Sequence, residues 1–374
     1  MRMAPGEITD RELMNEHDFN DFINFDRLVG TRTWAKLRFA ERQVLDKSNV
    51  HVGQYKLFLA DLLAIARAKP HLDNTDAKIV VIVAGSSPGF HWVPLVQALL
   101  TSNLQDRIYV RMFDGADVCA DLRTFMQAPA SRGRVTFERR WFDVALAEQL
   151  KQTHAQDDII FLCDIRSAIS GQDTHDEKDE ILIQQNMQLQ KEAVETMRPV
   201  YSCLKFRAPH ATKTHVQAYD NFLYLAGTPC LQGYHGETSA ELRLHVTQAD
   251  IDNGPVSYDP TDIEQKMFYY NTKLRTRTHT DDHYATLVWK ISASALAIDA
   301  DYWHAKTRAF LHIDRKLQQH NIAGHVGAAQ PAWDAQLSNL LLQITQRRRE
   351  RGLGVGAQTL KTLKTLKTLK TVHE

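Results

Sequence analysis

Two lysines and two acidic residues, drawn from four separate stretches of the chain, have side chains that could activate a weakly acidic hydroxyl. They are Lys56 in GQYK, Asp164 in CDIRS, Lys205 in LKFR and Glu241 in SAELR. A lysine whose pKa is lowered by burial and by a second lysine can take a proton from a hydroxyl or orient its lone pair. We assign that role to Lys205, and to Lys56 the stabilisation of the developing oxyanion. Asp164 and Glu241 would position the lysines and balance their charge.

Each of these residues also has an ordinary structural interpretation. A lysine at the end of a strand is usually solvated, and an acidic residue there usually caps a helix or pairs with an arginine. The order Lys, Asp, Lys, Glu around a glycine-rich loop is nevertheless typical of enzymes that methylate a ribose 2′-hydroxyl of RNA. The sequence therefore predicts a methyl-transfer site that uses all four residues and holds the methyl group in line with the hydroxyl.

A glycine-rich loop, AGSSPGFH at positions 84–91, follows an apolar run. Glycines at 85 and 89 allow a tight turn and a close approach to a ligand, and Pro88 stiffens the turn. Asp114, at the end of the next predicted strand, could accept hydrogen bonds from two ribose hydroxyls. The chain lacks GxGxxG, which makes NAD less suitable, and lacks GK[ST], which excludes a triphosphate-binding P-loop. We expect S-adenosylmethionine to bind through Gly85, Ser86, Ser87, Pro88, Gly89, His91 and Asp114; the alternative is an ordinary strand-to-helix turn.

Strand and helix patterns alternate over most of residues 51–275. Apolar or alternating runs predict strands over 78–84, 107–113, 134–142, 158–163, 200–206, 222–226 and 240–246. Helical spacing is found over 57–68, 91–100 and 181–197, the last interpreted as packing on the sheet. This alternation predicts an α/β fold with a mainly parallel sheet covered by helices on both faces. Ligands in such folds bind at the carboxyl ends of the strands, where Gly85, Asp114 and Asp164 fall.

The regions outside this core differ in composition. We take residues 1–50, which are polar and charged, as an N-terminal extension, and 276–345 as a helical region packed on the core. Residues 346–374 form a basic, low-complexity tail in which Thr-Leu-Lys is repeated, and its period of three matches neither a helix face nor a strand face. We predict that this tail is disordered, either as a contact for RNA phosphates or as a solvated segment without a role.

The composition predicts a soluble, intracellular protein without a metal. Lys plus Arg and Asp plus Glu number 45 each in 374 residues, so an RNA site requires local clustering of charge. The four cysteines form no CxxC pair, which argues against disulfides and a zinc–thiolate site. His279 and His283 have a spacing found in some metal sites, but without the HExxH glutamate we interpret them as a solvated helix start. No apolar run is long enough to cross a bilayer, and the first residues do not resemble a secretory signal.

Seven short motifs occur in the order known from one viral family: GQYK, GSSPGFH, FDG, CDIRS, SCLKFR, SAELRL and EQKMFYYN. Over residues 50–275 the chain resembles the poxvirus cap-specific mRNA 2′-O-methyltransferases, which also serve as the regulatory, processivity subunit of the viral poly(A) polymerase. The resemblance implies a Rossmann-like methyltransferase fold, S-adenosylmethionine as donor, and the capped 5′ end of mRNA as substrate, methylated at its first transcribed nucleotide. It also implies a cytoplasmic location, in a viral factory or virion, and a poly(A) polymerase catalytic subunit as a possible partner.

The resemblance also implies roles for individual positions. Lys56, Asp164, Lys205 and Glu241 fall on the catalytic set, while Ala116 replaces an arginine of the family, so the adenosine contacts must differ. Further cofactor positions are Gln54, Arg140 and Phe142. Residues expected to contact the cap or the RNA are Glu264, His210, Arg166, Ser167 and Arg207, although Arg139, Arg140, Arg207 and Arg243 could equally form ordinary ion pairs.

Two other functions remain open at this point. The first is a non-catalytic RNA-binding or processivity subunit of a poly(A) polymerase, which is compatible with catalysis. The second is a small-molecule O- or N-methyltransferase, against which the second lysine and the EQKMFYYN motif argue.

Overall fold

The computed structural model describes residues 53–72, 76–129, 131–166, 177–209, 222–234, 239–260, 262–263, 267, 280–304 and 307. The predicted extension over 1–50 and the predicted tail over 346–374 lie outside these residues, as does most of the helical region predicted over 276–345. These divisions of the chain therefore stay predictions.

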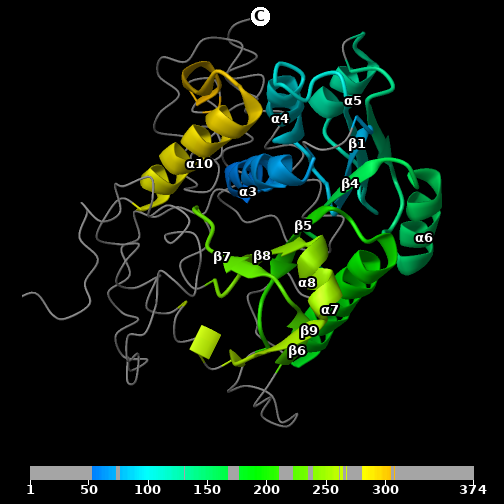
Figure 1. The fold of residues 1–374 in the computed structure, drawn as a ribbon, viewed down its shortest axis with the longest axis vertical. Coiled ribbons are helices and arrows are strands. Elements are labelled where there is room, and N and C mark those ends of the chain that lie inside the picture. Colours follow the sequence, from blue (N-terminus) through cyan, green and yellow to red (C-terminus); the bar gives the residue numbers. More distant parts are fainter. Residues whose placement is uncertain are drawn as a thin grey trace, which may run out of the picture.

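A seven-stranded, mostly parallel sheet forms the centre of the molecule (Figure 1). Its order is β3-β2-β1-β4-β5-β8-β7, and the first five of these strands run parallel, whereas β8 and β7 add to the edge in antiparallel pairs. The predicted α/β class is confirmed. The strands are β1 (Ile79–Ala84), β2 (Ile108–Phe113), β3 (Val135–Glu138), β4 (Asp158–Cys163), β5 (Tyr201–Phe206), β7 (Thr228–Cys230) and β8 (Leu242–Thr247).

Helices cover both faces of this sheet. On one side, α3 (Gly53–Ala68) and α4 (Trp92–Leu99) pack together, and α5 (Ala120–Gln127) contacts α4. On the other side, α6 (Val144–Thr153) packs on α7 (Glu177–Met197). Both α3 and α7 contact β4 and β5, so these two strands are enclosed from both faces. The short helices η4 (Lys69–His71) and α8 (Gln248–Asn253) follow α3 and β8.

The helix α3 is buried along almost its whole length. An apolar helix of this kind needs cover on two sides, and α10 (Thr280–Leu296) provides it opposite the sheet (Figure 1). Phe58 of α3 lies against Trp289 of α10, with ring centroids 5.4 Å apart. Part of the predicted C-terminal helical region thus packs on the core.

Three predicted elements differ from the structure. The strand predicted over 134–142 ends at Glu138, because β3 is a short edge strand and the chain leaves the sheet there. The segment 222–226 was expected in the main sheet, but β6 (Phe222–Leu225) pairs only with β9 (Pro255–Tyr258) in a separate two-stranded sheet. On α7, Ile181 is not packed on the sheet: it is 46% exposed, while Met187, Val194 and Met197 are buried as predicted.

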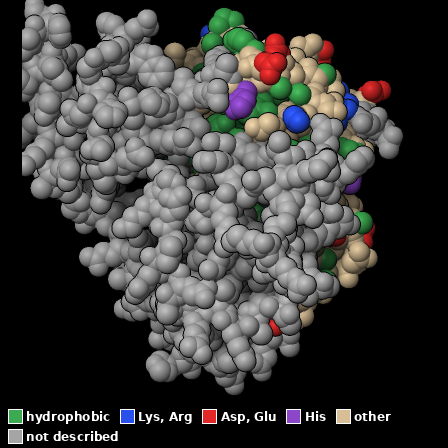
Figure 2. Space-filling view, turned by 90° about the vertical axis from the view of Figure 1, so that its left-hand side faces the viewer, with side chains coloured by type: hydrophobic (Ala, Val, Ile, Leu, Met, Phe, Trp, Pro, Cys, Tyr) green, Lys and Arg blue, Asp and Glu red, His purple; other side chains and the backbone are tan. Residues whose placement is uncertain are grey.

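The described surface carries charges of both signs. In Figure 2, acidic, basic and apolar side chains are interspersed over the described part of the face shown. Within the ranges described above, no helix has both the length and the apolar character needed to cross a membrane.

The helices change sides of the sheet between β1 and β4, which are neighbours in space. At this point Gly85 leaves β1 with φ +84°, and a Cβ there would lie 2.8 Å from the carbonyl carbon of Asp164 and 2.9 Å from the nitrogen of Ile165. Both contacts are with backbone atoms, which cannot move aside. Only glycine fits, and the predicted donor loop (residues 85–91) and Asp164 are thereby held in contact at the carboxyl edge of the sheet, where ligands of such folds bind.

We predict that Gly85→Ala lowers the free energy of unfolding by about 3 kcal/mol, the sum of a positive φ and a backbone clash. The matched control is Gly133→Ala, in a turn, which has φ +75° but open space around its Cβ, and should cost about 1 kcal/mol. Urea unfolding of both variants measures the difference. Equal losses would contradict the close approach between the loop and Asp164.

Candidate active site

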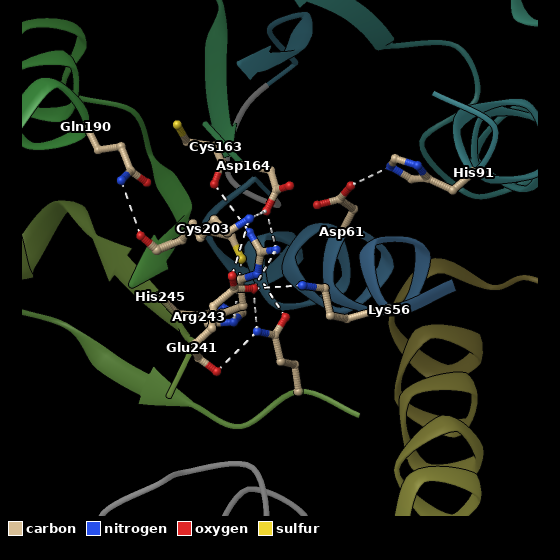
Figure 3. Close-up of polar contacts among 12 residues, drawn as sticks. Lys56, Asp61, His91, Cys163, Asp164, Gln190, Cys203, Glu241, Arg243 and His245 are labelled. Carbon is tan, nitrogen blue, oxygen red and sulfur yellow. Dashed lines mark hydrogen bonds and ion pairs between the residues drawn. The ribbon is translucent and has the colours of Figure 1, made fainter. Parts of the chain in front are cut away.

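The four predicted catalytic residues meet at the carboxyl ends of the parallel strands (Figure 3). The Nζ of Lys56 donates to Oε1 of Glu241 at 2.7 Å. The Nζ of Lys205 lies 3.2 Å from Oδ1 of Asp164 and 3.3 Å from Oε2 of Glu241. Glu241 therefore bridges the two lysines, one through each carboxylate oxygen.

Each of these residues is positioned by a different element. Lys56 lies in the first turn of α3, Asp164 follows β4, and Lys205 is inside β5. Glu241 directly precedes β8, and because β8 runs antiparallel to β5, its start lies at the edge where β5 ends. The predicted strand over 240–246 thus begins two residues later, which leaves Glu241 free to turn into the site.

Arg243 is a fifth charged member of the cluster. Its Nη2 lies 2.5 Å from Oδ1 of Asp164, and its Nη1 donates to the carbonyl of Cys163. Its Nε donates to Gln232, whose amide in turn donates to Glu241 at 2.8 Å. Of the two interpretations of Arg243, an RNA groove or an ion pair, the structure has the ion pair, and its partner is a predicted catalytic acid.

The charges of the cluster determine its protonation. Burial alone would raise the pKa of Asp164, but Lys205 and Arg243 outweigh it and lower this pKa to about 2. Burial likewise opposes ionisation of Glu241, and the nearby lysines hold its pKa well below the usual value. Burial lowers the pKa of Lys56, and the attraction of Glu241 offsets this only in part, while Lys205 lowers it further. Both acids are therefore anions at neutral pH.

Three cations thus face two anions. Lys56, Lys205 and Arg243 are paired with Asp164 and Glu241, and burial of an unbalanced charge is costly. Arginine keeps its proton, and the two carboxylates raise the pKa of Arg243 further. This surplus adds to burial in lowering the pKa of Lys56, because the positive charges of Lys205 and Arg243 both oppose its protonation.

The donor loop is held by Asp114. Its two carboxylate oxygens accept from the backbone nitrogens of Ser87 and Ala116 at 2.8 and 2.7 Å. The hydroxyl of Ser87 also donates to the carbonyls of Ala116 and Asp117, and the Ser87–Pro88 peptide bond is cis. Gly89 has φ +75°. Ser86 is buried with its hydroxyl directed at the carbonyl of Phe113, so its side chain turns away from the cleft.

Gln54 and His91, both predicted to contact the cofactor, contact each other. The Nδ1 of His91 lies 3.0 Å from Oε1 of Gln54. Its Nε2 lies 3.0 Å from Oδ2 of Asp61 (Figure 3). The pair connects the donor loop to α3, the helix that carries Lys56. Sequence analysis did not single out Asp61, although a lone acid within the apolar run LFLADLLAIARA was the available signal.

The last two predicted cofactor positions follow β3. Phe142 is buried in the core, stacked on Phe161 with centroids 5.4 Å apart. Arg140 is near the surface and donates to Gln149. In this arrangement Phe142 packs in the core, and a cofactor contact at Arg140 or at Phe142 stays a prediction.

Among the predicted RNA contacts, Arg166 stands out. Its Nη1 and Nη2 atoms are buried without a hydrogen-bond partner in the described part of the chain. Arg207 instead forms a buried ion pair with Glu180 of α7. Ser167, His210 and Glu264 lie outside the described residues, as does His279, and no group of side chains within them could hold a metal ion.

The sequence model of the family described as Poly A polymerase regulatory subunit matches residues 22–304. The chain belongs to this family. The predicted resemblance is confirmed, and with it a Rossmann-like methyltransferase fold for the mostly parallel sheet and its helices.

The relatives of this family member include viral proteins named cap-specific mRNA (nucleoside-2′-O-)-methyltransferase. The protein from Myxoma virus (strain Lausanne) is 28% identical over 236 residues, which are 61% of this chain and 62% of that protein. The protein from Fowlpox virus (strain NVSL) is 26% identical over 272 residues, covering 70% of this chain and 79% of the relative. The chain thus spans 62% of the length of the Myxoma virus protein.

The low pKa of Asp164 predicts how stability depends on pH. Because this pKa lies below the ordinary value of 3.8, the carboxylate stabilises the folded state above about pH 4 and loses its contribution as pH falls towards 2. We expect Asp164→Asn to lower the free energy of unfolding by about 2 kcal/mol at pH 7. Between pH 4 and 2 the free energy of unfolding of this variant should fall less than that of wild type.

Urea unfolding at pH 7, 4, 3 and 2 measures this. The control is Asp143→Asn, because asparagine also caps the helix α6 that Asp143 begins. That variant retains Asp164, so its free energy of unfolding should fall between pH 4 and 2 by as much as that of wild type. A wild-type profile parallel to that of Asp164→Asn would contradict the ion pairs assigned to Asp164.

Proposed function

We propose that this protein transfers a methyl group from S-adenosylmethionine to a ribose 2′-hydroxyl of capped mRNA, with Lys56, Asp164, Lys205 and Glu241 as the catalytic residues. One observation carries the proposal: the amine of Lys205 lies between two carboxylates, beside a second lysine and an arginine, at the edge of the sheet where the donor loop begins.

The donor would supply an electrophilic methyl group on a sulfonium. The 2′-hydroxyl oxygen forms the new bond to the methyl carbon, the carbon–sulfur bond breaks with its electrons on sulfur, and the hydroxyl proton passes to the amine of Lys205. For this step Lys205 must be neutral when the hydroxyl arrives. In this proposed division of charge, the neutral amine of Lys205 accepts the proton, while Lys56, held by Glu241, stabilises the developing oxyanion.

Glu241 makes this division of charge possible. Because it contacts Lys56 through Oε1 and Lys205 through Oε2, the carboxylate can strengthen its bond to one amine as the other loses its proton. Arg243 and Lys205 contact the same oxygen of Asp164, Oδ1, so Arg243 competes with Lys205 for the negative charge of that acid. The same contacts fix the direction of the Lys205 lone pair towards the cleft.

Arg166 is the proposed contact for the RNA backbone. A buried guanidinium with two unpartnered nitrogens costs free energy, and its planar fork suits the oxygens of a phosphate. It follows Asp164 by two residues, so a phosphate bound there would hold the neighbouring ribose close to Lys205. The names of the viral relatives support the cap as part of the substrate, with Glu264 and His210 as the predicted cap contacts.

A second function is favoured by the family itself. The description Poly A polymerase regulatory subunit supports a role as the partner of a poly(A) polymerase catalytic subunit. The two functions are compatible, because an RNA-binding cleft serves both.

The decisive experiment replaces Lys205 with alanine. We expect Lys205→Ala to lose methyl transfer from labelled S-adenosylmethionine to short capped RNA by at least about 100-fold, as is usual for a lost proton acceptor. Binding of S-adenosylhomocysteine, measured by calorimetry, should be retained. Lys151→Ala, which removes an exposed lysine of α6, is the control and should keep wild-type activity.

Each other outcome removes a different part of the proposal. Methyl transfer retained by Lys205→Ala would show that another group takes the proton. Equal labelling of capped and uncapped RNA would remove the cap from the substrate. Donor binding by wild type without label on any RNA would leave only the regulatory function.

We further expect Arg166→Gln to raise the KM for RNA about tenfold, the loss of one charge-assisted contact, and to leave S-adenosylhomocysteine binding unchanged. The slope of the logarithm of the RNA-binding constant against the logarithm of the salt concentration should become shallower by about one unit. Arg132→Gln, at an exposed arginine, is the matched control. An unchanged salt slope in Arg166→Gln would contradict the phosphate contact.

A further inference from the structure

Three cations surround one tyrosine ring towards the amino edge of the sheet, the edge opposite the catalytic residues. The Nζ of Lys78 lies 5.5 Å from the centroid of the Tyr109 ring, and the guanidinium carbons of Arg111 and Arg134 lie 5.7 and 5.9 Å from it. Contacts of this length are cation–π interactions. We call these four residues the basic patch. In a chain whose formal net charge is zero, it is a local concentration of positive charge.

The sheet holds the basic patch in place. Lys78 directly precedes β1 and Arg134 directly precedes β3, while Tyr109 and Arg111 alternate with buried residues along β2. The carbonyl of Arg134 accepts a hydrogen bond from the backbone nitrogen of Val110 at 2.7 Å. Lys78 is exposed and the other three residues of the patch are half-buried. The cations are therefore fixed in position and remain open to a ligand.

The charge of the basic patch is not neutralised by carboxylates of the described residues. Asp158, at the start of β4, lies 3.7 Å from Arg107 instead, and Asp157 lies 2.9 Å from the histidine that ends α6. Asp76 and Asp106 are exposed and form no ion pair with the patch. One nitrogen each of Arg111 and Arg134 is directed at a backbone carbonyl, which leaves the rest of each guanidinium fork for an anion.

The distance between the basic patch and the catalytic cluster suits one long ligand. The strand β1 joins the two edges with six residues, which span about 20 Å at about 3.3 Å per residue. A nucleic-acid strand that rises about 3.4 Å per nucleotide covers this distance with about six nucleotides. An RNA whose 5′ end lies at the catalytic edge can therefore extend to the patch, and its phosphates match the guanidinium forks.

We propose that the basic patch binds the phosphate backbone of the RNA downstream of its methylated end, an assignment that rests on the proposed use of RNA as substrate. The patch positions the RNA without reading its bases, because Tyr109 orders the cations and the cations contact phosphates. A contact outside the cleft also serves the regulatory function, since it holds RNA whether or not a methyl group is transferred.

The test compares RNA of two lengths on the full chain carrying Lys78→Gln and Arg134→Gln together. For capped RNA of about 20 nucleotides, we expect the Kd to rise about tenfold. The slope of the logarithm of the binding constant against the logarithm of the salt concentration should become shallower by about 1.5 units, about 0.7 for each lost phosphate contact. Capped RNA of about four nucleotides is too short to reach the patch, so its Kd and its rate of methylation should equal those of wild type.

The matched control is Arg123→Gln with Lys290→Gln, which removes the same charge from exposed residues of α5 and α10. It should bind both RNAs as wild type does. Lys78→Glu alone changes one exposed residue, so it tests the patch even if the double variant does not fold. It should raise the Kd for the long RNA about fivefold and leave the short RNA unaffected.

Three results would overturn the proposal. The first is an unchanged Kd for the long RNA in both patch variants, and the second is an equal loss of binding in the control. The third is wild-type RNA binding by the patch variants with loss of binding to a polyglutamate peptide, which would assign the patch to an acidic protein segment. Failure of wild type to methylate RNA of either length would instead overturn the proposed function, while the length dependence of RNA binding would still decide the role of the patch.

Discussion

The arrangement depends on a constraint of charge: five ionisable side chains are buried together, and each of the three cations contacts at least one of the two carboxylates. Two carboxylates cannot be buried in this protein without cations in contact, and three cations cannot be buried without them. Glu241 forms ion pairs with Lys56 of α3 and Lys205 of β5. Asp164 forms ion pairs with Lys205 and Arg243. The elements that carry these residues are therefore tied to one another by the chemistry of the site as well as by the core.

The fold brings these charges together through the direction of its strands. Asp164 and Lys205 come from neighbouring parallel strands, whose carboxyl ends share one edge of the sheet. Arg243 lies opposite Lys205 in the antiparallel pair of β5 with β8, and Lys56 is presented by a helix enclosed between the sheet and α10. Apolar packing of α3 thus positions Lys56, a charged side chain that could not be buried without a counter-charge.

The sequence predicts the parts of this structure that depend on local pattern. The strand over 158–163 and the clustering of Lys56, Asp164, Lys205 and Glu241 could be predicted because apolar runs end at polar residues that suit one chemistry. Arg243 and Gln232 could not be assigned, since their partners depend on the antiparallel register of β8, which no local pattern specifies. The segment 222–226 was placed in the wrong sheet for the same reason: its partner, β9, is distant in sequence.

The reversed direction of β8 has a consequence for how this chain can change in evolution. Glu241 enters the site from the beginning of a strand, so residues before Ser239 can be inserted or deleted without moving it along the sheet. A single residue inserted between Glu241 and Arg243 would turn one of the two to the opposite face, because successive side chains of a strand alternate. Length variation among descendants of this sequence should therefore accumulate on one side of Glu241 and be absent on the other.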